Sequence, residues 1–289
     1  MFKIARNDKC WCGCGKKYKQ CHERSDEENL KDYLKDGYPL PDKSLILTKE
    51  DIAGVKESGK VVHDILDALE DFIKIGVTTQ AIDNLVASMM EKAGATSATL
   101  GYNGFPKSCC TSINNVICHG IPDGTILKDG DIINVDITTL LNGYYADSSR
   151  MYLVGDVSEE AKELVETAKQ CMIKGIEAIK PYTPVAVIGN TINDITDKHG
   201  YGIVRDLCGH GVGLEFHGDP VVNHFRNANK TMILVPGMVL TVEPMVNAGT
   251  WECNVSKADG WTVTTKDNKL SAQWEHTILV TEDGAEILT

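Results

Sequence analysis

Residues 131–150 read DIINVDITTLLNGYYADSSR, which predicts a long β-hairpin. Asn142-Gly143 between two strand-like runs is the strongest short-range signal for a hairpin with a two-residue turn. With that turn, Asp136 lies opposite Ser149, and Asp147 lies on the same face two residues away. The two aspartates are then diagonal neighbours, roughly 7–8 Å apart at Cα. They could share one ion, although a three-residue loop would reverse this parity.

The first aspartate of the pair stands where a buried strand is expected. Asp136 follows the apolar run Ile132-Ile133-Asn134-Val135. Two solvated strand aspartates remain the alternative for the pair taken alone. However, a buried carboxylate needs a partner, and a cation is one.

Two further carboxylates stand in apolar strand patterns. Glu243 ends the run of residues 239–243, and Pro244 keeps it extended. Residues 273–280 read QWEHTILV and predict a third strand, which carries Glu275. A salt bridge at a strand end is the alternative for each carboxylate alone.

Three histidines are flanked by glycine. His210 lies in CGHGVG (residues 208–213), His217 precedes Gly218, and His119 precedes Gly120. Glycine allows a sharp turn or a close backbone approach. A phosphate-binding loop is the weak competitor at residues 208–213, but no Lys-Ser/Thr follows it.

Together these residues offer two aspartates, two glutamates and one histidine as metal donors. Oxygen-rich donors with one imidazole suit divalent Mn, Fe, Co or Zn. Four carboxylates neutralise two divalent cations, and such a pair, about 3.5–4 Å apart, supports hydrolysis of a carbonyl compound. No GxSxG motif competes with this hypothesis.

Composition limits the class of protein. The chain has 289 residues, a formal charge of −12, 42% hydrophobic and 24% charged residues, which predicts one large globular domain with a small appendage. No apolar run of 18 residues and no signal peptide is found. The acidic total argues against a DNA-binding protein. Ten cysteines, four of them clustered, suit a reducing cytosol and a metal site.

The order of predicted elements repeats along the chain. Thr48-Lys49-Glu50-Asp51 opens a helix with a capping-box pattern, and a second helix closes at Gly94. Strands and turns follow over residues 99–154. Ser158 then caps a third helix, and Gly200 closes a fourth before more strands. This order predicts a duplication, and duplicated folds tend to bind ligands between their halves.

The N-terminal segment has a composition of its own. Residues 1–24 carry a net charge of +5, which leaves −17 on the rest of the chain. Residues 10–22 read CWCGCGKKYKQCH, whose C-x-C-x8-C-H pattern offers three thiolates and one imidazole for tetrahedral zinc. So short a module has too little core to fold without metal. Redox-active thiols are the second hypothesis. The predicted zinc ligands are Cys10, Cys12, Cys21 and His22.

Residues from about 45 to 289 resemble type I methionine aminopeptidases. The matching stretches are GYNGFPKSCCTSINNVICHGIP, GDIINVDIT, GYYADSSR, GHGVGLEFHGDP, LTVEPM and WTVTTKDNKLSAQWEHTI. The resemblance implies the α+β pita-bread fold, with two related halves around a dimetal centre. It suggests a zinc module over residues 1–24, a linker over 25–47, possibly helical at first, and a catalytic domain over 48–289.

The resemblance also implies roles for individual residues. In that family the counterparts of Asp147 and Glu275 bridge the two ions, which are Co, Mn, Fe or Zn. His119 and His217 match its substrate histidines, and we assign proton shuttling to Glu243. The implied metal ligands are Asp136, Asp147, His210, Glu243 and Glu275. The implied walls of a methionine pocket are Tyr102, Phe105, Phe216 and Trp261.

Some features of the resemblance leave alternatives open. The four aromatic residues would otherwise be read as core packing. Thr99 and Asn103 depart from many bacterial relatives and leave the pocket shape open. The N-terminal segment looks like the SEC-C motif, but Cys14 replaces the usual serine and could exchange with another ligand. Its basic charge suggests docking to an acidic partner, either the ribosome or a chaperone.

Three functions are therefore compared. The first is removal of the initiator methionine from nascent proteins, with a small second residue preferred, by attack of a dimetal-held hydroxide on the first peptide bond. The second is an Xaa-Pro hydrolase, a class that usually has an additional N-terminal domain. The third is a non-catalytic binding protein, although all five metal donors are present. We favour the first, and expect a cytoplasmic monomer that binds neither membrane nor DNA.

Overall fold

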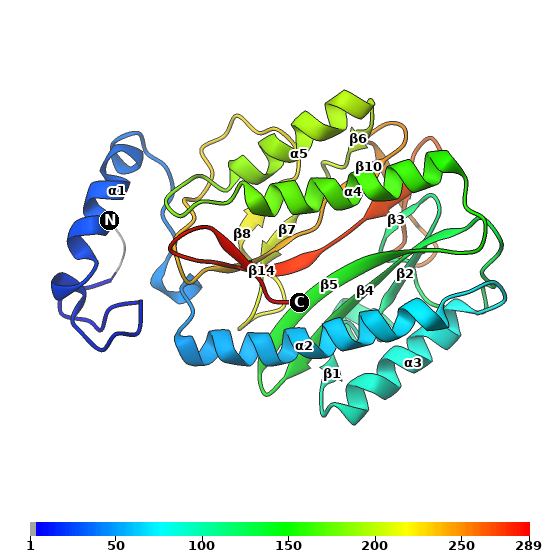
Figure 1. Cartoon of the computed structure of the whole chain (residues 1–289), viewed down its shortest axis with the longest axis horizontal. Helices are drawn as coiled ribbons and strands as arrows, with labels where there is room; N and C mark the ends of the chain where they lie inside the picture. Colours follow the sequence, from blue (N-terminus) through cyan, green and yellow to red (C-terminus); the bar gives the residue numbers. More distant parts are fainter. Residues whose placement is uncertain (1–3) are drawn as a thin grey trace.

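The computed structural model describes residues 4–289, so residues 1–3 of the predicted N-terminal module lie outside it. Figure 1 shows a small N-terminal unit beside a larger body whose long helices lie on one side of the β-sheets. The N-terminal unit and the segment after it contain the elements η1 (Tyr18–Gln20), α1 (Glu23–Lys35) and η2 (Lys43–Leu45).

The first half of the body begins with the predicted helix pair, α2 (Lys49–Phe72) and α3 (Thr79–Lys92). The predicted capping box at Thr48 is confirmed, since its side chain accepts from the backbone N–H of Asp51, whose carboxylate accepts from that of Thr48. The other elements of this half are β1 (Thr96–Ser97), η3 (Tyr102–Gly104), β2 (Cys110–Ile113), β3 (Val116–Cys118), β4 (Ile132–Leu141) and β5 (Tyr144–Leu153).

The predicted hairpin is formed by β4 and β5 in the predicted register. Asn142 and Gly143 have φ angles of 52° and 90°, as a two-residue type I′ turn requires. Asp136 pairs with Ser149, so Asp136 and Asp147 share one face of the sheet. The predicted placement of Asp136 and Asp147 on the same face of the hairpin is confirmed.

The second half repeats the order of the first. It contains α4 (Glu159–Glu177), capped by Ser158, and α5 (Ala186–His199), which ends at Gly200 in the left-handed conformation. Its strands are β6 (Gly202–Ile203), β7 (Gly209–Gly211), β8 (Gly218–Val222), β9 (Val239–Val242), β10 (Met245–Asn247), β11 (Cys253–Val255), β12 (Val263–Thr265), β13 (Ser271–Gln273), β14 (His276–Val280) and β15 (Ala285–Ile287).

Each half has sheets of its own, and a further sheet of order β11-β12-β3 joins the halves, because β3 comes from the first half. In the first half β4 lies between β1 and β2 and also pairs with β5, and in the second half the order is β15-β14-β9-β7-β8. Helices α2 and α3 cover the first half, and α4 and α5 cover the second (Figure 1). Burial of apolar side chains between these helices and the sheets provides the main stabilisation of the body.

One predicted strand is wrong in part. Residues 273–280 do not form a single strand, because the chain leaves β13 at Gln273 and enters β14 at His276. Between them, the backbone N–H of Glu275 donates to Ser149 O at 3.1 Å, and the Ser148 hydroxyl donates to Glu275 O at 2.5 Å. The chain changes sheets here because β5 takes over the hydrogen bonds of Glu275.

A buried carboxylate joins the N-terminal unit to the body. Asp26 in α1 is 1% exposed. It accepts hydrogen bonds from Trp11 Nε1 at 3.0 Å, from Tyr18 Oη at 2.9 Å and from Tyr182 Oη of the body at 2.7 Å. Tyr18 also belongs to the apolar cluster that continues under α4 and α5. The N-terminal unit is therefore packed on the body.

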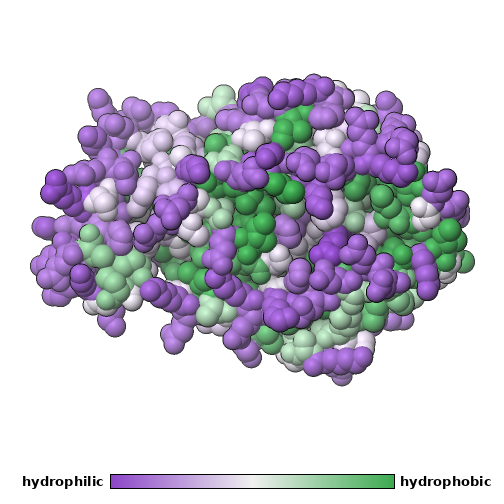
Figure 2. Space-filling model, viewed as in Figure 1, coloured by the Kyte–Doolittle hydropathy of each residue, from purple (hydrophilic) through white to green (hydrophobic). Residues whose placement is uncertain are grey.

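Hydrophilic side chains cover most of the face in Figure 2, including the N-terminal unit. Among residues 4–289, no helix combines the length and the apolar character that a membrane crossing requires.

Candidate metal centre and active site

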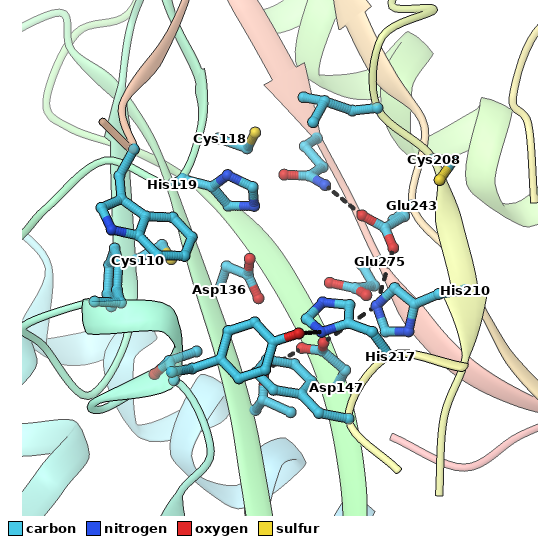
Figure 3. A pocket seen from close by; sticks show the side chains of 18 of the residues that line it. Cys110, Cys118, His119, Asp136, Asp147, Cys208, His210, His217, Glu243 and Glu275 are labelled. Carbon is cyan, nitrogen blue, oxygen red and sulfur yellow. Dashed lines mark hydrogen bonds and ion pairs between the residues drawn. The ribbon is translucent and has the colours of Figure 1, made fainter. Parts of the chain in front are cut away.

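The five predicted metal donors come from both halves and converge on one space (Figure 3). Asp136 and Asp147 belong to β4 and β5, and His210 belongs to β7. Glu243 directly follows β9, and Glu275 directly precedes β14. All five line one cavity of ≈ 340 Å³. Strands of both halves thus supply donors to a single site.

Distances between the donor atoms are those of a compact cluster. Donor atoms of Asp147, His210 and Glu275 all lie within 4.8 Å of one another. His210 Nε2 is 3.7 Å from Asp147 Oδ2 and 3.7 Å from Glu243 Oε1. A buried oxygen, Asp136 Oδ1, has no hydrogen-bond partner among the described residues. The cluster therefore contains a buried carboxylate oxygen, a possible metal ligand, that no described protein group pairs with.

The electrostatics of the cluster also suit cations. Burial raises the pKa of Glu243 to about 8 and that of Asp136 to about 6. Burial, together with the neighbouring carboxylates, raises the pKa values of Asp147 and Glu275 well above the usual range. Four carboxylates so close together, three of them buried and Asp136 partly buried, repel one another unless they are protonated or a cation is present. The donor set therefore fits divalent cations, which the five residues would hold.

The histidine of the cluster is neutral, as a metal ligand must be. Burial lowers the pKa of His210 to about 4, and its Nδ1 lies 3.0 Å from the carbonyl oxygen of Gly211. This contact places the proton on Nδ1, so Nε2 keeps its lone pair for a metal. The flanking glycines permit close approach, because a Cβ on Gly211 would lie 1.9 Å from Asp219 O.

A second layer of polar residues orients Glu243. The Thr241 hydroxyl donates to Glu243 Oε1 at 2.7 Å, and Gln273 Nε2 donates to Oε2 at 3.2 Å. The backbone N–H of Glu243 donates to Nε2 of the buried His224 at 3.1 Å. Thr138 likewise donates to Asp147 Oδ1 at 2.9 Å. Such outer contacts fix the direction of a ligand.

None of these residues that contact Glu243 or Asp147 was among the predicted site residues. Thr241 could have been found, because it shares a strand face with Glu243 at the two-residue period. The sequence gives no comparable signal for His224, since its contact with residue 243 joins distant segments.

The four predicted aromatic residues line the same cavity as the donors. The ring of Tyr102 lies 4.7 Å from that of Phe216, and Phe105 meets Trp261 edge-on at 5.2 Å. The pairs therefore form two sides of one apolar space, which suits a thioether side chain. Thr99 and Asn103 are also in the lining, as are three cysteines that the sequence analysis did not single out, Cys110, Cys118 and Cys208.

The two remaining histidines lie beside the donors. The ring of His217 lies 4.3 Å from that of His210. His119 meets Trp261 edge-on at 5.9 Å and has a left-handed φ of 56°. Burial lowers the pKa of His119 to about 4, so it is neutral at neutral pH. The structure thus brings all the predicted site residues of the body together, while their individual roles stay predictions.

The four predicted zinc ligands form a second cluster in the N-terminal unit. Donor atoms of Cys10, Cys12, Cys21 and His22 lie within 4.8 Å of one another. The Cys12 and Cys21 sulfurs are 3.7 Å apart, and two thiolates on one tetrahedral zinc, with Zn–S of about 2.3 Å, would be about 3.8 Å apart. The cluster therefore fits a structural metal ion.

The alternative ligand Cys14 lies at the edge of this cluster. Its sulfur is 3.5 Å from that of Cys21, and the side chain is exposed. The backbone N–H of Lys16 donates to the Cys14 sulfur and lowers its pKa to about 7. Exchange of Cys14 into the ligand set remains open on this geometry.

Comparison with known proteins identifies the family. The pattern described as metallopeptidase family M24 matches residues 53–282. A methionine aminopeptidase from Chlamydia pneumoniae is 44% identical over 289 residues, which cover 99% of both chains. The chain belongs to the methionine aminopeptidases of family M24. It is therefore a metallo-exopeptidase that removes N-terminal methionine.

Solved structures agree with this M24 assignment. The crystal structure of methionine aminopeptidase from Rickettsia prowazekii matches with a TM-score of 0.83 and 46% identity, covering 84% of this chain and 98% of that one. Prolidase from Pyrococcus furiosus matches with a TM-score of 0.68 and 23% identity, covering 90% of this chain and 68% of the prolidase. The second match shows the pita-bread fold alone and lends no support to the Xaa-Pro alternative.

The N-terminal unit of this methionine aminopeptidase also has a family. The SEC-C motif matches residues 6–24, which contain the cluster of Cys10, Cys12, Cys21 and His22. The predicted resemblance to that motif is confirmed.

Proposed function

We propose that this enzyme removes the initiator methionine from nascent proteins in the cytoplasm and prefers a small second residue. One observation carries the proposal. Five metal donors from both halves converge in the same cavity whose other walls are aromatic. A methionine side chain held by those walls would place the first peptide bond beside the donors.

The predicted ligands Asp136, Asp147, His210, Glu243 and Glu275 would hold two divalent cations. Such a pair supplies polarisation of the scissile carbonyl and a water nucleophile of lowered pKa. The chain's own residues bind and orient the substrate and move protons around that chemistry. The preference for a dinuclear centre rests on the four clustered carboxylates, whose charge two divalent cations would neutralise.

The histidines and Glu243 have distinct tasks in this mechanism. His217 donates a hydrogen bond to the carbonyl oxygen as negative charge develops on it. His119, on the other side of the cavity, positions the peptide bond as a neutral hydrogen-bonding group. Glu243 moves the proton from the nucleophile to the leaving amine.

The preference for a small second residue follows from the size of the cavity. About 340 Å³ must hold a methionine side chain and the first peptide bond. Leu207, Cys208, Met245 and Gln273 also line this space. A bulky second side chain would compete with these residues for room.

A peptide assay tests the proposed activity. The full chain is incubated with Mn²⁺ or Co²⁺ and with Met-Ala-Ser, Met-Phe-Ser or an Xaa-Pro peptide, and the products are read by mass. We expect release of methionine from Met-Ala-Ser and much less from Met-Phe-Ser. Equal cleavage of the two methionine peptides would contradict the size preference, and cleavage of the Xaa-Pro peptide alone would contradict the proposed reaction.

For the N-terminal unit we propose a structural zinc ion and an anionic partner, with the ribosome preferred and a chaperone second. Arg6 pairs with Glu23, and Arg24 pairs with Glu28. By contrast, four exposed lysines of this unit have no ion pair within residues 4–289, and Lys9 and Lys17 are neighbours across a β-bridge. These four are Lys9, Lys16, Lys17 and Lys19. An acidic enzyme with a basic surface there favours attraction to phosphate.

Sedimentation with ribosomes tests the partner. The full chain should pellet with ribosomes at low salt, and replacing the four lysines by glutamine should abolish this while peptide cleavage is retained. A matched control replaces four lysines of the body, Lys60, Lys162, Lys174 and Lys266, by glutamine. Equal pelleting of the two variants would contradict the proposed surface, and capture of a chaperone without ribosome binding would favour the second partner.

A further inference from the structure

One side-chain hydrogen bond between the two halves lies in the lining of the cavity. Tyr102 belongs to η3 in the first half, and His217 lies between β7 and β8 in the second. Tyr102 Oη and His217 Nδ1 are 3.0 Å apart (the dashed line that ends at His217 in Figure 3). Tyr102, one of the four predicted pocket-wall residues, therefore contacts the histidine that we propose faces the scissile carbonyl.

The segment that carries Tyr102 is held in an unusual conformation. Asn103 has a left-handed φ of 45°, and Gly101 has a φ of 84°. The backbone N–H of Gly101 donates to Phe105 O at 2.7 Å, and that of Phe105 donates to Tyr102 O at 2.8 Å. These bonds close a tight loop that holds the backbone of Tyr102, and the ring is held by its contact with Phe216.

The chemistry of the two groups sets the direction of the hydrogen bond. A phenol is a good donor, whereas its oxygen is a poor acceptor because its lone pair is delocalised into the ring. Neutral imidazole has one accepting nitrogen and one N–H. If Tyr102 donates to Nδ1 of His217, the imidazole proton must lie on Nε2.

We propose that Tyr102 is a positioning residue, whose hydroxyl holds His217 in the Nε2–H form so that Nε2 can donate to the substrate carbonyl. This inference rests on the proposed function of His217. The ring of Tyr102 also packs against Phe216 and lines the methionine pocket. One residue thereby links recognition of the methionine side chain to the orientation of the group that stabilises the oxyanion.

The loop itself shows that a hydroxyl is not needed for packing alone. Phe105, three residues from Tyr102, lines the same cavity, is 3% exposed and packs edge-on against Trp261 without any polar group. Phenylalanine therefore suffices where the loop provides only a wall. The hydroxyl occurs at the position that reaches His217.

The test is Tyr102→Phe in the full chain, which keeps the ring and removes the hydroxyl. The tautomer of His217 is read from long-range ¹H–¹⁵N correlation spectra of the ¹⁵N-histidine-labelled, zinc-loaded enzyme. The His217 signal is assigned by its loss in His217→Gln. In the wild type we expect protonation at Nε2, and in Tyr102→Phe a mixture of the two tautomers.

Kinetics on Met-Ala-Ser with Mn²⁺ provide the second readout. Loss of one hydrogen bond that orients a catalytic group should lower kcat about tenfold and change KM by less than about twofold. The matched control is Tyr145→Phe, because Tyr145 stacks on Phe216 at 6.1 Å in the same neighbourhood. It should leave both the tautomer and kcat unchanged.

The proposal is overturned by an unchanged His217 tautomer in Tyr102→Phe, or by a rise in KM with kcat unchanged, since either result makes Tyr102 a wall and nothing more. Failure of the proposed reaction is distinguishable. A wild type that does not cleave Met-Ala-Ser would contradict the activity, while the spectra would still show whether Tyr102 sets the tautomer.

Discussion

At the scale of single residues, each predicted metal donor lies in or directly beside a strand that lines the cavity, and this brings the donors together. Asp136 and Asp147 could be paired from sequence, since a two-residue turn fixes the register of their hairpin. Glu243, Glu275 and one histidine could be added as candidates by donor type, but only the resemblance assigned His210 and the two glutamates to the same centre, because no local pattern states which distant strands meet. His224 was missed for the same reason, although its Nε2 accepts from the backbone of Glu243.

The buried carboxylates predict how the metal-free enzyme responds to pH. Burial raises the folded-state pKa of Glu243 to about 8, so the folded state holds a proton that the unfolded chain, with a glutamate pKa of about 4.3, has already lost. The free energy of unfolding therefore falls as pH rises from about 4 to about 8. Buried histidines such as His210, whose folded pKa is lowered, act in the opposite sense, but only below a pH of about 6.5.

The measurement is the Tm of chelated protein at pH 7 and pH 8.5, compared with that of Glu243→Gln, which cannot ionise at this position. The wild type should lose Tm over this interval relative to the variant. Added Mn²⁺ at pH 8.5 should restore the Tm of the wild type by binding the folded state. A Tm difference that is independent of pH would show that Glu243 is not held protonated in the metal-free site.

At the scale of elements, the sequence predicted the helices and the hairpin best, because their signals are local. Thr48, Ser158 and Gly200 marked helix ends that the structure contains. The break between β13 and β14 was not predicted. It arises because β5, far away in sequence, supplies hydrogen bonds to Glu275. Strand limits therefore depend on partners that a local pattern does not reveal.

The cap of α2 gives a prediction at this scale. Thr48→Ala removes the side chain that accepts from the backbone N–H of Asp51, which should cost about 1 kcal/mol of stability and lower the Tm by about 2 °C. Thr48→Ser keeps the hydroxyl and should remain close to the wild type. Thermal unfolding of both variants measures the difference. Equal Tm values for the alanine and serine variants would mean that the capping box contributes little.

At the scale of the whole molecule, the N-terminal unit and the body form one packed structure. The sequence indicated two modules through their opposite charges, with a connector between them. It did not predict that Asp26, within that connector, would be buried between Trp11, Tyr18 and Tyr182. An aspartate in an acidic helical run looks solvated, and only the approach of the body makes it an acceptor for three donors.

Asp26→Asn should release the N-terminal unit. The amide offers a single acceptor oxygen to three donors, and each buried donor left unpaired costs about 1–3 kcal/mol. We expect faster proteolysis over residues 36–47, while cleavage of Met-Ala-Ser is retained because the five donors of the active site are untouched. Glu27→Gln, the exposed neighbour on α1, is the control. Identical rates of proteolysis in the two variants would exclude Asp26 as the group that holds the unit in place.

The most direct test of the metal centre is anomalous diffraction from crystals of the full chain loaded with Mn²⁺. The account predicts two manganese peaks within bonding distance of Asp136, Asp147, His210, Glu243 and Glu275, and a separate zinc peak among Cys10, Cys12, Cys21 and His22. Manganese peaks elsewhere, or none in the cavity of an enzyme that still cleaves Met-Ala-Ser, would contradict it.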